Sequence, residues 1–265
     1  MSRSQDRNQD GPRLPPELER EIFTLSLKLQ VQNGRNLMLV RVAKRVFDWL
    51  IPVYYSVVIG GLDWPPKCSA ALLRRYGHHV RHFHIQNRSL IDLLQYCPNV
   101  SNLGIWILSL DPEAEAEAIV NLPVTRLSIG IQCIFEKTPK FLAFCSNITH
   151  LEISTREPWE PAEILPHFPV LTRLAIFADF TTELTQECLT VGKMLKVIIL
   201  ISSQTNQSGQ LHVLKNELED DIRVVRLLFG RSFVEDWAEG AWGRRDMWMR
   251  SDEMVERRIE RSLEL

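Results

Sequence analysis

A short apolar pattern recurs along the middle of the chain. Each copy is a hexapeptide whose first, fourth and sixth residues are apolar, and consecutive copies start 20, 24, 24, 23, 24 and 27 residues apart. The seven copies are VRHFHI at Val80, VSNLGI at Val100, VTRLSI at Val124, ITHLEI at Ile148, LTRLAI at Leu171, LKVIIL at Leu195 and IRVVRL at Ile222. A fixed period of this length predicts repeats that each supply a strand and bury their apolar face only against their neighbours.

Apolar pairs precede most of these hexapeptides at a steady distance. They are Leu72 with Leu73, Leu93 with Leu94, Phe141 with Leu142, Ile164 with Leu165, and Cys188 with Leu189. We interpret each pair as the inward face of a helix that leads into the next strand. The pattern therefore predicts an α/β fold over residues 61–231, a solenoid of parallel strands with helices.

The period and the hexapeptide resemble those of leucine-rich repeats. Typical members carry Asn or Cys three residues after the third apolar position. Here those places hold Arg88, Leu108, Gln132, Arg156, Asp179, Ser203 and Gly230. The chain is similar in this respect to degenerate leucine-rich repeats, about seven of them, and the resemblance implies an irregular arc.

Alternation along a strand separates the side chains that face the core from those that face away from it. If the second and third apolar residues of each hexapeptide point inward, the positions that flank them point out of the concave face of the sheet. From this face we select as candidate substrate-binding residues His82, His84, Trp106, Arg126, His150, Glu152, Arg173 and Phe177. Its basic, small and aromatic side chains suit recognition of a protein segment, and its Arg and His residues suit an acidic one.

The same face becomes apolar in the last two repeats. There the flanking positions are Val197, Ile199, Ile201, Val224, Arg226 and Leu228, of which five are apolar. Residues 232–265 then bring three tryptophans, and they place Trp248, Val255 and Ile259 on one face of a helix. We expect this segment to be a helical cap that packs against the final strands. The alternative is an amphipathic helix that binds a partner.

The N-terminal part of the chain follows a helical pattern. Residues 1–12 are polar and predict a disordered tail, and residues 13–60 predict short amphipathic helices. Leu18, Ile22 and Leu25 share one helical face, and Val42 and Trp49 recur at helical spacing further on. So much apolar surface exceeds what a unit of fewer than fifty residues can bury alone, so another protein or the repeats must cover it.

This segment resembles an F-box. The LPPE start, the apolar helix, the polar turn and VRVAKRVFDWLIPVYYSVVI are most similar to the F-box variants abundant in fungal proteins. Ala43 and Val46 stand where a common F-box has Cys and Trp. The resemblance implies a Skp1-like partner that contacts Leu14, Pro15, Leu18, Ile22, Val42 and Trp49. The alternative is a helical hairpin that only caps the repeats.

Composition narrows the classes of function. A net charge of −2 argues against nucleic-acid binding through a globally basic surface. The longest apolar run, Val197 to Ile201, is too short to cross a membrane, and no signal peptide is recognisable at the N-terminus. Five cysteines without a CxxC pair favour buried free thiols, and hence the cytoplasm or nucleus.

No catalytic pattern stands out in the sequence. It has no GxSxG, P-loop, HExxH or GxGxxG motif, so we expect neither an enzyme nor a cofactor. His78, His79, His82 and His84 lie close together, but we interpret them as exposed histidines and expect no metal site.

An F-box followed by such repeats resembles F-box leucine-rich-repeat proteins. This resemblance implies a substrate-recognition adaptor of an SCF-type ubiquitin ligase, with an unknown substrate protein bound by the repeats. The alternative is a repeat-based binding scaffold without a role in ubiquitin transfer.

Overall fold

The structure is a computed structural model, and it describes residues 14–32, 38–60, 68–106, 117–130, 139–154, 159–177, 182–203, 221–229 and 233–264. The chain divides into two compact units, Met1–Tyr54 and Tyr55–Leu265. The predicted disordered tail, residues 1–12, lies outside the described residues.

The first unit is helical. It contains α1 (Pro16–Gln32), the short 3₁₀ helix η1 (Leu39–Arg41) and α2 (Lys44–Tyr54). Pro16 starts α1, where a missing amide hydrogen costs nothing, and Glu17 and Glu19 occupy the first turn, where the helix dipole favours negative charge. Helix α1 packs against α2, and the buried apolar residues of this unit include Leu27 of α1 and Val46 and Leu50 of α2.

The second unit is built on one sheet of eight parallel strands in sequence order. The strands are β1 (Val57–Gly60), β2 (His82–Ile85), β3 (Asn102–Ile105), β4 (Arg126–Gly130), β5 (His150–Ser154), β6 (Arg173–Phe177), β7 (Val197–Ser203) and β8 (Val224–Phe229). Strands β2 to β8 lie where the seven hexapeptides predict them. The α/β class and the parallel sheet are thereby confirmed.

Strand β1 also belongs to this sheet, although its sequence does not match the hexapeptide pattern. Val57–Gly60 pairs with His82–Ile85 of β2, and Val58 packs into the same core as Phe83. Gly60 stands at the sixth position of the pattern, and a Cβ there would lie 2.4 Å from Leu90 Cδ1, so Leu90 fills that space. The boundary expected between residues 60 and 61 is therefore wrong, because β1 already lies in the second unit.

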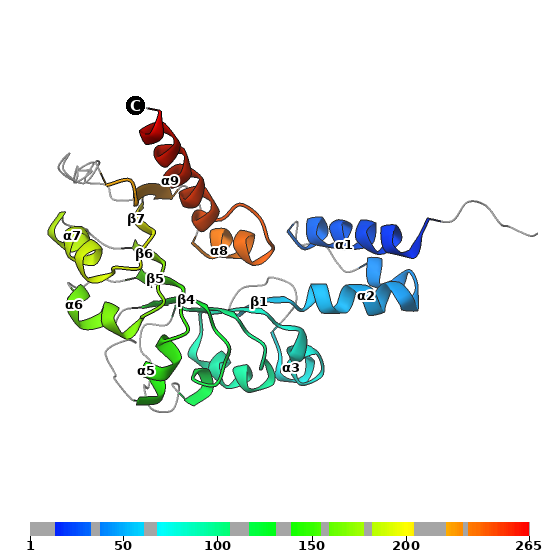
Figure 1. Cartoon of the computed structure of the whole chain (residues 1–265). Coiled ribbons are helices and arrows are strands. Elements are labelled where there is room, and N and C mark those ends of the chain that lie inside the picture. The colour runs from blue at the N-terminus through cyan, green and yellow to red at the C-terminus, as the bar shows by residue number, and fades with distance from the viewer. Residues whose placement is uncertain are drawn as a thin grey trace, which may run out of the picture. The chain divides into compact units, whose positions relative to one another are not determined.

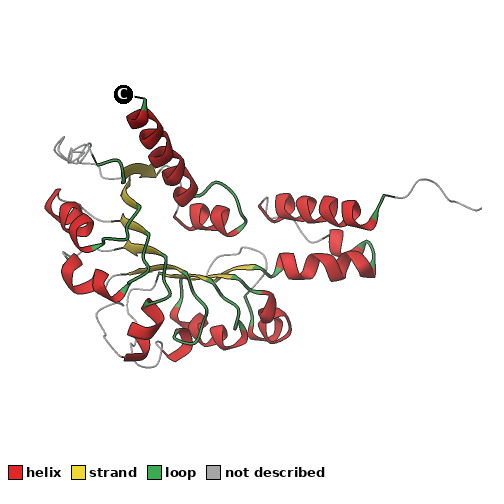
Figure 2. Ribbon diagram, in the orientation of Figure 1, coloured by secondary structure: helices red, strands yellow, loops and turns green. Residues whose placement is uncertain are grey.

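Helices cover both faces of the sheet (Figure 2). The outer face carries the helices that connect the strands (Figure 1). They are α3 (Ala70–Tyr76), the 3₁₀ helices η2 (Gly77–His79) and η3 (Arg88–Tyr96), α5 (Pro139–Cys145), α6 (Pro161–Ile164) with the 3₁₀ helix η5 (Leu165–His167), and α7 (Thr182–Val191). Every predicted apolar pair has at least one buried member in the core between these helices and the sheet.

A ladder of hydroxyl groups joins the starts of successive strands. The second residue of four consecutive hexapeptides is Ser or Thr, and its hydroxyl donates to the carbonyl of the corresponding residue one repeat earlier. The O···O distances are 3.3 Å from Ser101 to Arg81, 3.4 Å from Thr125 to Ser101, 3.1 Å from Thr149 to Thr125, and 3.2 Å from Thr172 to Thr149. These hydrogen bonds tie neighbouring repeats together at the entry to the sheet.

The register of β8 differs from the one that its hexapeptide predicts. Val224 pairs with Ile198 and Val225 with Ile199, so β8 is shifted by one residue against the preceding strands. A shift by one residue turns every side chain to the other face. Val225 and Leu227 therefore lie on the concave side and Val224 packs into the core, which makes the prediction that Val224 and Arg226 face the concave side wrong. The side chain of Leu228 lies outside the described part of the structure.

The C-terminal helices explain this shift. Met247, Trp248 and Val255 of α9 (Met247–Leu263) form a buried apolar cluster with Val197, Ile199, Ile201 and Val225. Helix α9 thus buries apolar side chains on the concave side of β8. Ile222, the first residue of the hexapeptide, is instead 39 % exposed. The predicted packing of this segment on the final strands is observed, except that Ile259 is exposed rather than buried.

The C-terminal segment covers more than the final strands. Helix α8 (Phe233–Ala241) lies on the same face and reaches towards β1, so α8 and α9 together lie across the concave face (Figure 1). At the last strand, Arg258 Nη1 of α9 donates to the carbonyl of Val224 at 2.6 Å. Among the described helices, none is long and apolar enough to span a membrane.

Loss of the hydroxyl ladder should weaken the sheet unit. We expect the triple variant Thr125→Val, Thr149→Val, Thr172→Val to lose roughly 2 kcal/mol of unfolding free energy, because each hydrogen bond contributes about 0.5–1 kcal/mol. Urea unfolding followed by tryptophan fluorescence measures this. The control is Thr190→Val, whose hydroxyl bonds only within α7. Equal stability of the triple variant and the control would contradict a stabilising role for the ladder.

Removal of residues 232–265 should make the chain aggregate. The truncation exposes the concave faces of Val197, Ile199, Ile201 and Val225, which α9 buries in the intact chain. Size-exclusion chromatography with light scattering measures the outcome. A truncated chain that stays monomeric and melts at the same temperature as the intact chain would show that the helices are dispensable for stability.

Candidate protein-binding surfaces

An exposed apolar stripe runs along α1. Leu18, Ile22, Leu25 and Leu29 recur at helical spacing, and each is between 49 and 61 % exposed. Among the described side chains of α1, only Leu27, on the opposite side of the helix, is fully buried. The helical unit therefore has its own small core and still leaves most of the large apolar side chains of α1 uncovered.

The residues expected to contact a Skp1-like partner are mostly part of this exposed surface. Leu14, Pro15, Leu18, Ile22 and Val42 are all exposed. Trp49 is half-buried, with the Arg45 guanidinium 5.9 Å from its ring centroid. The sequence analysis did not select Leu29 and Met38, which are also exposed, although Leu29 continues the spacing of Ile22 and Leu25.

The two positions that depart from the F-box pattern differ in their environment. Val46 is buried in the core of the helical unit, so it takes no part in the exposed stripe. Ala43 is half-buried, immediately before the start of α2. Val46 thus contributes to the interior of the helical unit and not to its exposed surface.

The eight candidate substrate-binding residues all lie on the concave side of β2 to β6 and at their ends. The helices α8 and α9 cover them there. His84 is 1 % exposed and Glu152 4 % exposed, and the other six are half-buried. The expectation of an open recognition face with exposed histidines is therefore wrong, because the C-terminal segment of the same chain occupies that face.

Aromatic side chains of the C-terminal helices pack against this face. The ring of Trp237 lies against His84 with centroids 5.1 Å apart and against His82 at 6.5 Å. Phe233 packs against Trp106 at 5.0 Å and against Phe177 at 4.5 Å. His84 has room for its ring because its neighbour on β3 is Gly104, where a Cβ would lie 2.5 Å from the imidazole.

Ion pairs also join the C-terminal segment to this face of the sheet. Arg173 of β6 binds the carboxylate of Asp252 through two nitrogens, at 2.9 Å from Nε and 2.9 Å from Nη2. Arg126 of β4 lies 3.8 Å from Asp246, the residue that caps the start of α9. Arg126 and Arg173 were expected to attract an acidic ligand, and the acidic residues that they meet belong to the same chain.

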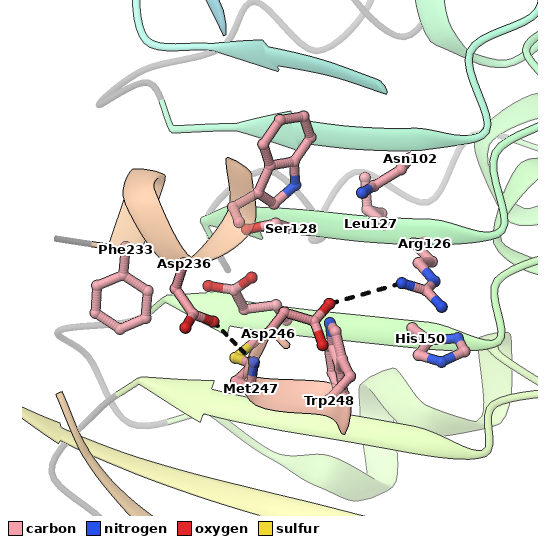
Figure 3. A pocket seen from close by; sticks show the side chains of 12 residues that line it. Asn102, Arg126, Leu127, Ser128, His150, Phe233, Asp236, Asp246, Met247 and Trp248 are labelled. Atoms are coloured by element: carbon pink, nitrogen blue, oxygen red, sulfur yellow. Dashed lines mark hydrogen bonds and ion pairs between the residues drawn. The ribbon is translucent and has the colours of Figure 1, made fainter. Parts of the chain in front are cut away.

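A small pocket remains between the concave face and the two helices (Figure 3). Its lining includes Arg126, Ser128, His150 and Glu152 from the sheet. The helices contribute Phe233, Asp236, Trp237, Asp246, Met247 and Trp248. Asp236 and Asp246 were not among the predicted site residues, because nothing in their local sequence indicates which strands they face.

Three buried carboxylates meet in this pocket. Asp236 accepts a hydrogen bond from the Met247 amide at 2.8 Å and pairs with Arg250 at 2.7 Å. Asp246 accepts from the Met249 amide at 2.9 Å. Burial raises the pKa of Glu152 to about 7, with a further increase from Asp236 and Asp246 that a hydrogen bond from Ser128 opposes.

The histidines on this face are shifted in the opposite direction. Burial lowers the pKa of His84 to about 4. Burial, assisted by Arg126, also lowers the pKa of His82 to about 4 and that of His150 to about 3. Each ring is therefore neutral at pH 7.

The remaining chemistry of the described residues offers no metal site. Within those ranges no group of three or more His, Cys, Asp or Glu side chains could hold an ion. Cys97, Cys145 and Cys188 are buried free thiols and Cys68 is a half-buried one. Cys133 lies outside the described residues.

No protein-family model matches the chain, and no curated protein does.

Replacement of Glu152 by Gln should stabilise the sheet unit at alkaline pH. Because the pKa of Glu152 rises from 4.5 to about 7 on folding, its neutral form contributes fully below pH 4.5, and that contribution is lost as the pH rises to 7. We expect Glu152→Gln to add on the order of 2 kcal/mol at pH 8 and close to nothing at pH 4.5. Urea unfolding at both pH values measures the difference.

The matched control is Glu256→Gln on the exposed side of α9. It should leave the stability within about 0.5 kcal/mol at both pH values. A Glu152→Gln variant that is no more stable than wild type at pH 8 would show that the buried carboxylate costs the fold nothing.

Proposed function

We propose that the chain is a substrate-recognition adaptor of an SCF-type ubiquitin ligase. In this proposal α1 and α2 bind a Skp1-like protein, and the repeats, with the C-terminal helices packed on them, bind a substrate protein. The observation that carries it is the exposed apolar stripe on α1, at the residues that the F-box resemblance assigns to partner binding.

The stripe has the character of a surface that binds a helical partner. Leu18, Ile22, Leu25 and Leu29 form one continuous face, and an amphipathic helix that docks into an apolar groove uses anchors at this spacing. Exposed Met38 and Val42, next to η1, add apolar area of the same unit. Because Leu27, Val46 and Leu50 already form a core, the stripe is not needed to hold α1 and α2 together.

The architecture of the second unit supports the other half of the proposal. Parallel strands in sequence order, with short helices on the outer face in the described connections, are the arrangement that leucine-rich repeats adopt. A substrate would bind a composite surface formed by α8, α9 and the strand ends between them. Arg126 remains accessible there, with 41 % of its side chain exposed.

Charges on the stripe should abolish partner binding. We expect the double variant Leu18→Asp, Val42→Asp to lose co-purification of a co-expressed Skp1-like protein, because each substitution would bury an unpaired carboxylate in an apolar interface. The sheet unit should keep its melting temperature, since both residues are exposed. A pull-down from the co-expressing cells, with a thermal melt of the purified chain, measures both effects.

The control is Met194→Asp, which charges an exposed apolar residue of the sheet unit. It should retain the Skp1-like partner. If the double variant retains it too, the helices are not an F-box, and the repeat-based binding scaffold without a role in ubiquitin transfer becomes the better description.

A further inference from the structure

Three of the seven histidines of the chain are held beneath the C-terminal helices. His82 and His84 of β2 both pack against Trp237 of α8. His150 of β5 packs edge-on against Trp248 of α9, with ring centroids 5.2 Å apart. Each of the two helices thus rests one tryptophan on the imidazole rings of the concave face.

Among the described residues, no anionic partner favours the charged form of these imidazoles. The Nδ1 atoms of His82 and His84 are buried without a hydrogen-bond partner, and Nδ1 of His150 meets the Thr149 hydroxyl at 2.9 Å. In the described part of the chain, no carboxylate forms an ion pair with any of the three. A proton added to these rings would therefore create a buried and unpaired charge.

The charged groups of the surrounding elements either oppose protonation of the histidines or already have other partners. Arg81 and Arg126 face His82, and Arg126 and Arg173 face His150, so the nearest cations oppose protonation. The carboxylates of the same interface bind other groups. Asp252 binds Arg173, and Asp246 binds Arg126 and the Met249 amide. Asp236 binds Arg250 and the Met247 amide, and Glu152 accepts a hydrogen bond from Ser128.

We propose that protonation of His82, His84 and His150 releases α8 and α9 from the concave face, so that acidification uncovers the surface that the helices occupy at neutral pH. The protonated imidazoles become fully hydrated only when Trp237 and Trp248 move away. The device depends on the contacts of the C-terminal segment alone, so it holds whether or not the chain is a ubiquitin-ligase adaptor.

The direction and size of the effect follow from the pKa values. Since the histidine pKa values are lowered by the covering helices, docking is fully stabilised above the ordinary value of 6.5 and is lost as the pH falls towards 4. Each released histidine favours opening by about tenfold between pH 7.5 and 5.5. Glu152 and Asp246, whose pKa values are raised, act in the opposite sense and reduce the total. The net expectation is an opening at least about tenfold more frequent at pH 5.5.

Amide hydrogen exchange of the full chain tests this proposal. Protection of the peptides from Phe233–Leu263, corrected for the intrinsic pH dependence of exchange, should fall at least about tenfold from pH 7.5 to 5.5. Protection of α7, on the outer face, should stay the same. Wild-type protection of α8 and α9 that is equal at the two pH values, or higher at pH 5.5, would overturn the proposal.

The variant that isolates the cause is His82→Asn, His150→Asn, which changes two half-buried rings and leaves fully buried His84 in place. The fall in protection should disappear, because Glu152 alone outweighs the single remaining histidine. The control His78→Asn changes an exposed histidine outside the interface and should retain the full fall. A double variant that keeps the wild-type fall would also overturn the proposal.

A second measurement covers the case in which the double variant fails to dock at pH 7.5. Proton NMR of the wild-type chain follows each histidine during an acid titration. The proposal requires three imidazoles that stay neutral well below pH 6.5 and become charged only as α8 and α9 open. Seven histidines that all titrate near pH 6.5 while the helices stay protected would refute it.

Discussion

The packing of α9 on the last strands is the interaction on which the sheet unit depends. Strands β7 and β8 present valines and isoleucines on both faces, which is the composition of a strand buried on two sides. The outer helices can cover only one of these faces. Met247, Trp248 and Val255 cover the other, and β8 takes the register that presents Val225 and Leu227 to them. The local sequence of β8 thus yields to a helix that follows it in the chain.

The positions of strands β2 to β7 could be predicted from the sequence because the same apolar spacing recurs in each repeat. A residue such as Val80 or Val124 must be buried at the start of its strand, and the alternation after it fixes which side chains face the core. Strand β1 escapes the pattern because Gly60 takes the place of the third apolar residue and Leu90 of the next repeat fills the gap. The register of β8 escapes it because only a long-range contact distinguishes the two possible registers.

The surfaces were predictable to different degrees for the same reason. The stripe on α1 can be predicted from the spacing of Leu18, Ile22 and Leu25, since no described segment of its unit covers those side chains. The concave residues were placed on the correct face, but their burial was not foreseen. The sequence of an amphipathic helix such as α9 indicates that one side is buried. It does not indicate which strands that side packs against. Even a strong hydrogen-bonded pair such as Arg173 with Asp252 joins residues far apart in the chain.

The contact of Arg258 with β8 affects whether a strand of a second copy could pair with this edge of the sheet. The final strand of an open parallel sheet exposes unpaired carbonyls and amides, which offer a template for a strand from another molecule. The guanidinium of Arg258 occupies the carbonyl of Val224 at that border and brings a positive charge with it. A strand arriving from a second copy would have to displace this donor and leave the charge beside its own backbone. The arginine therefore occupies one of the backbone carbonyls that an added strand would need.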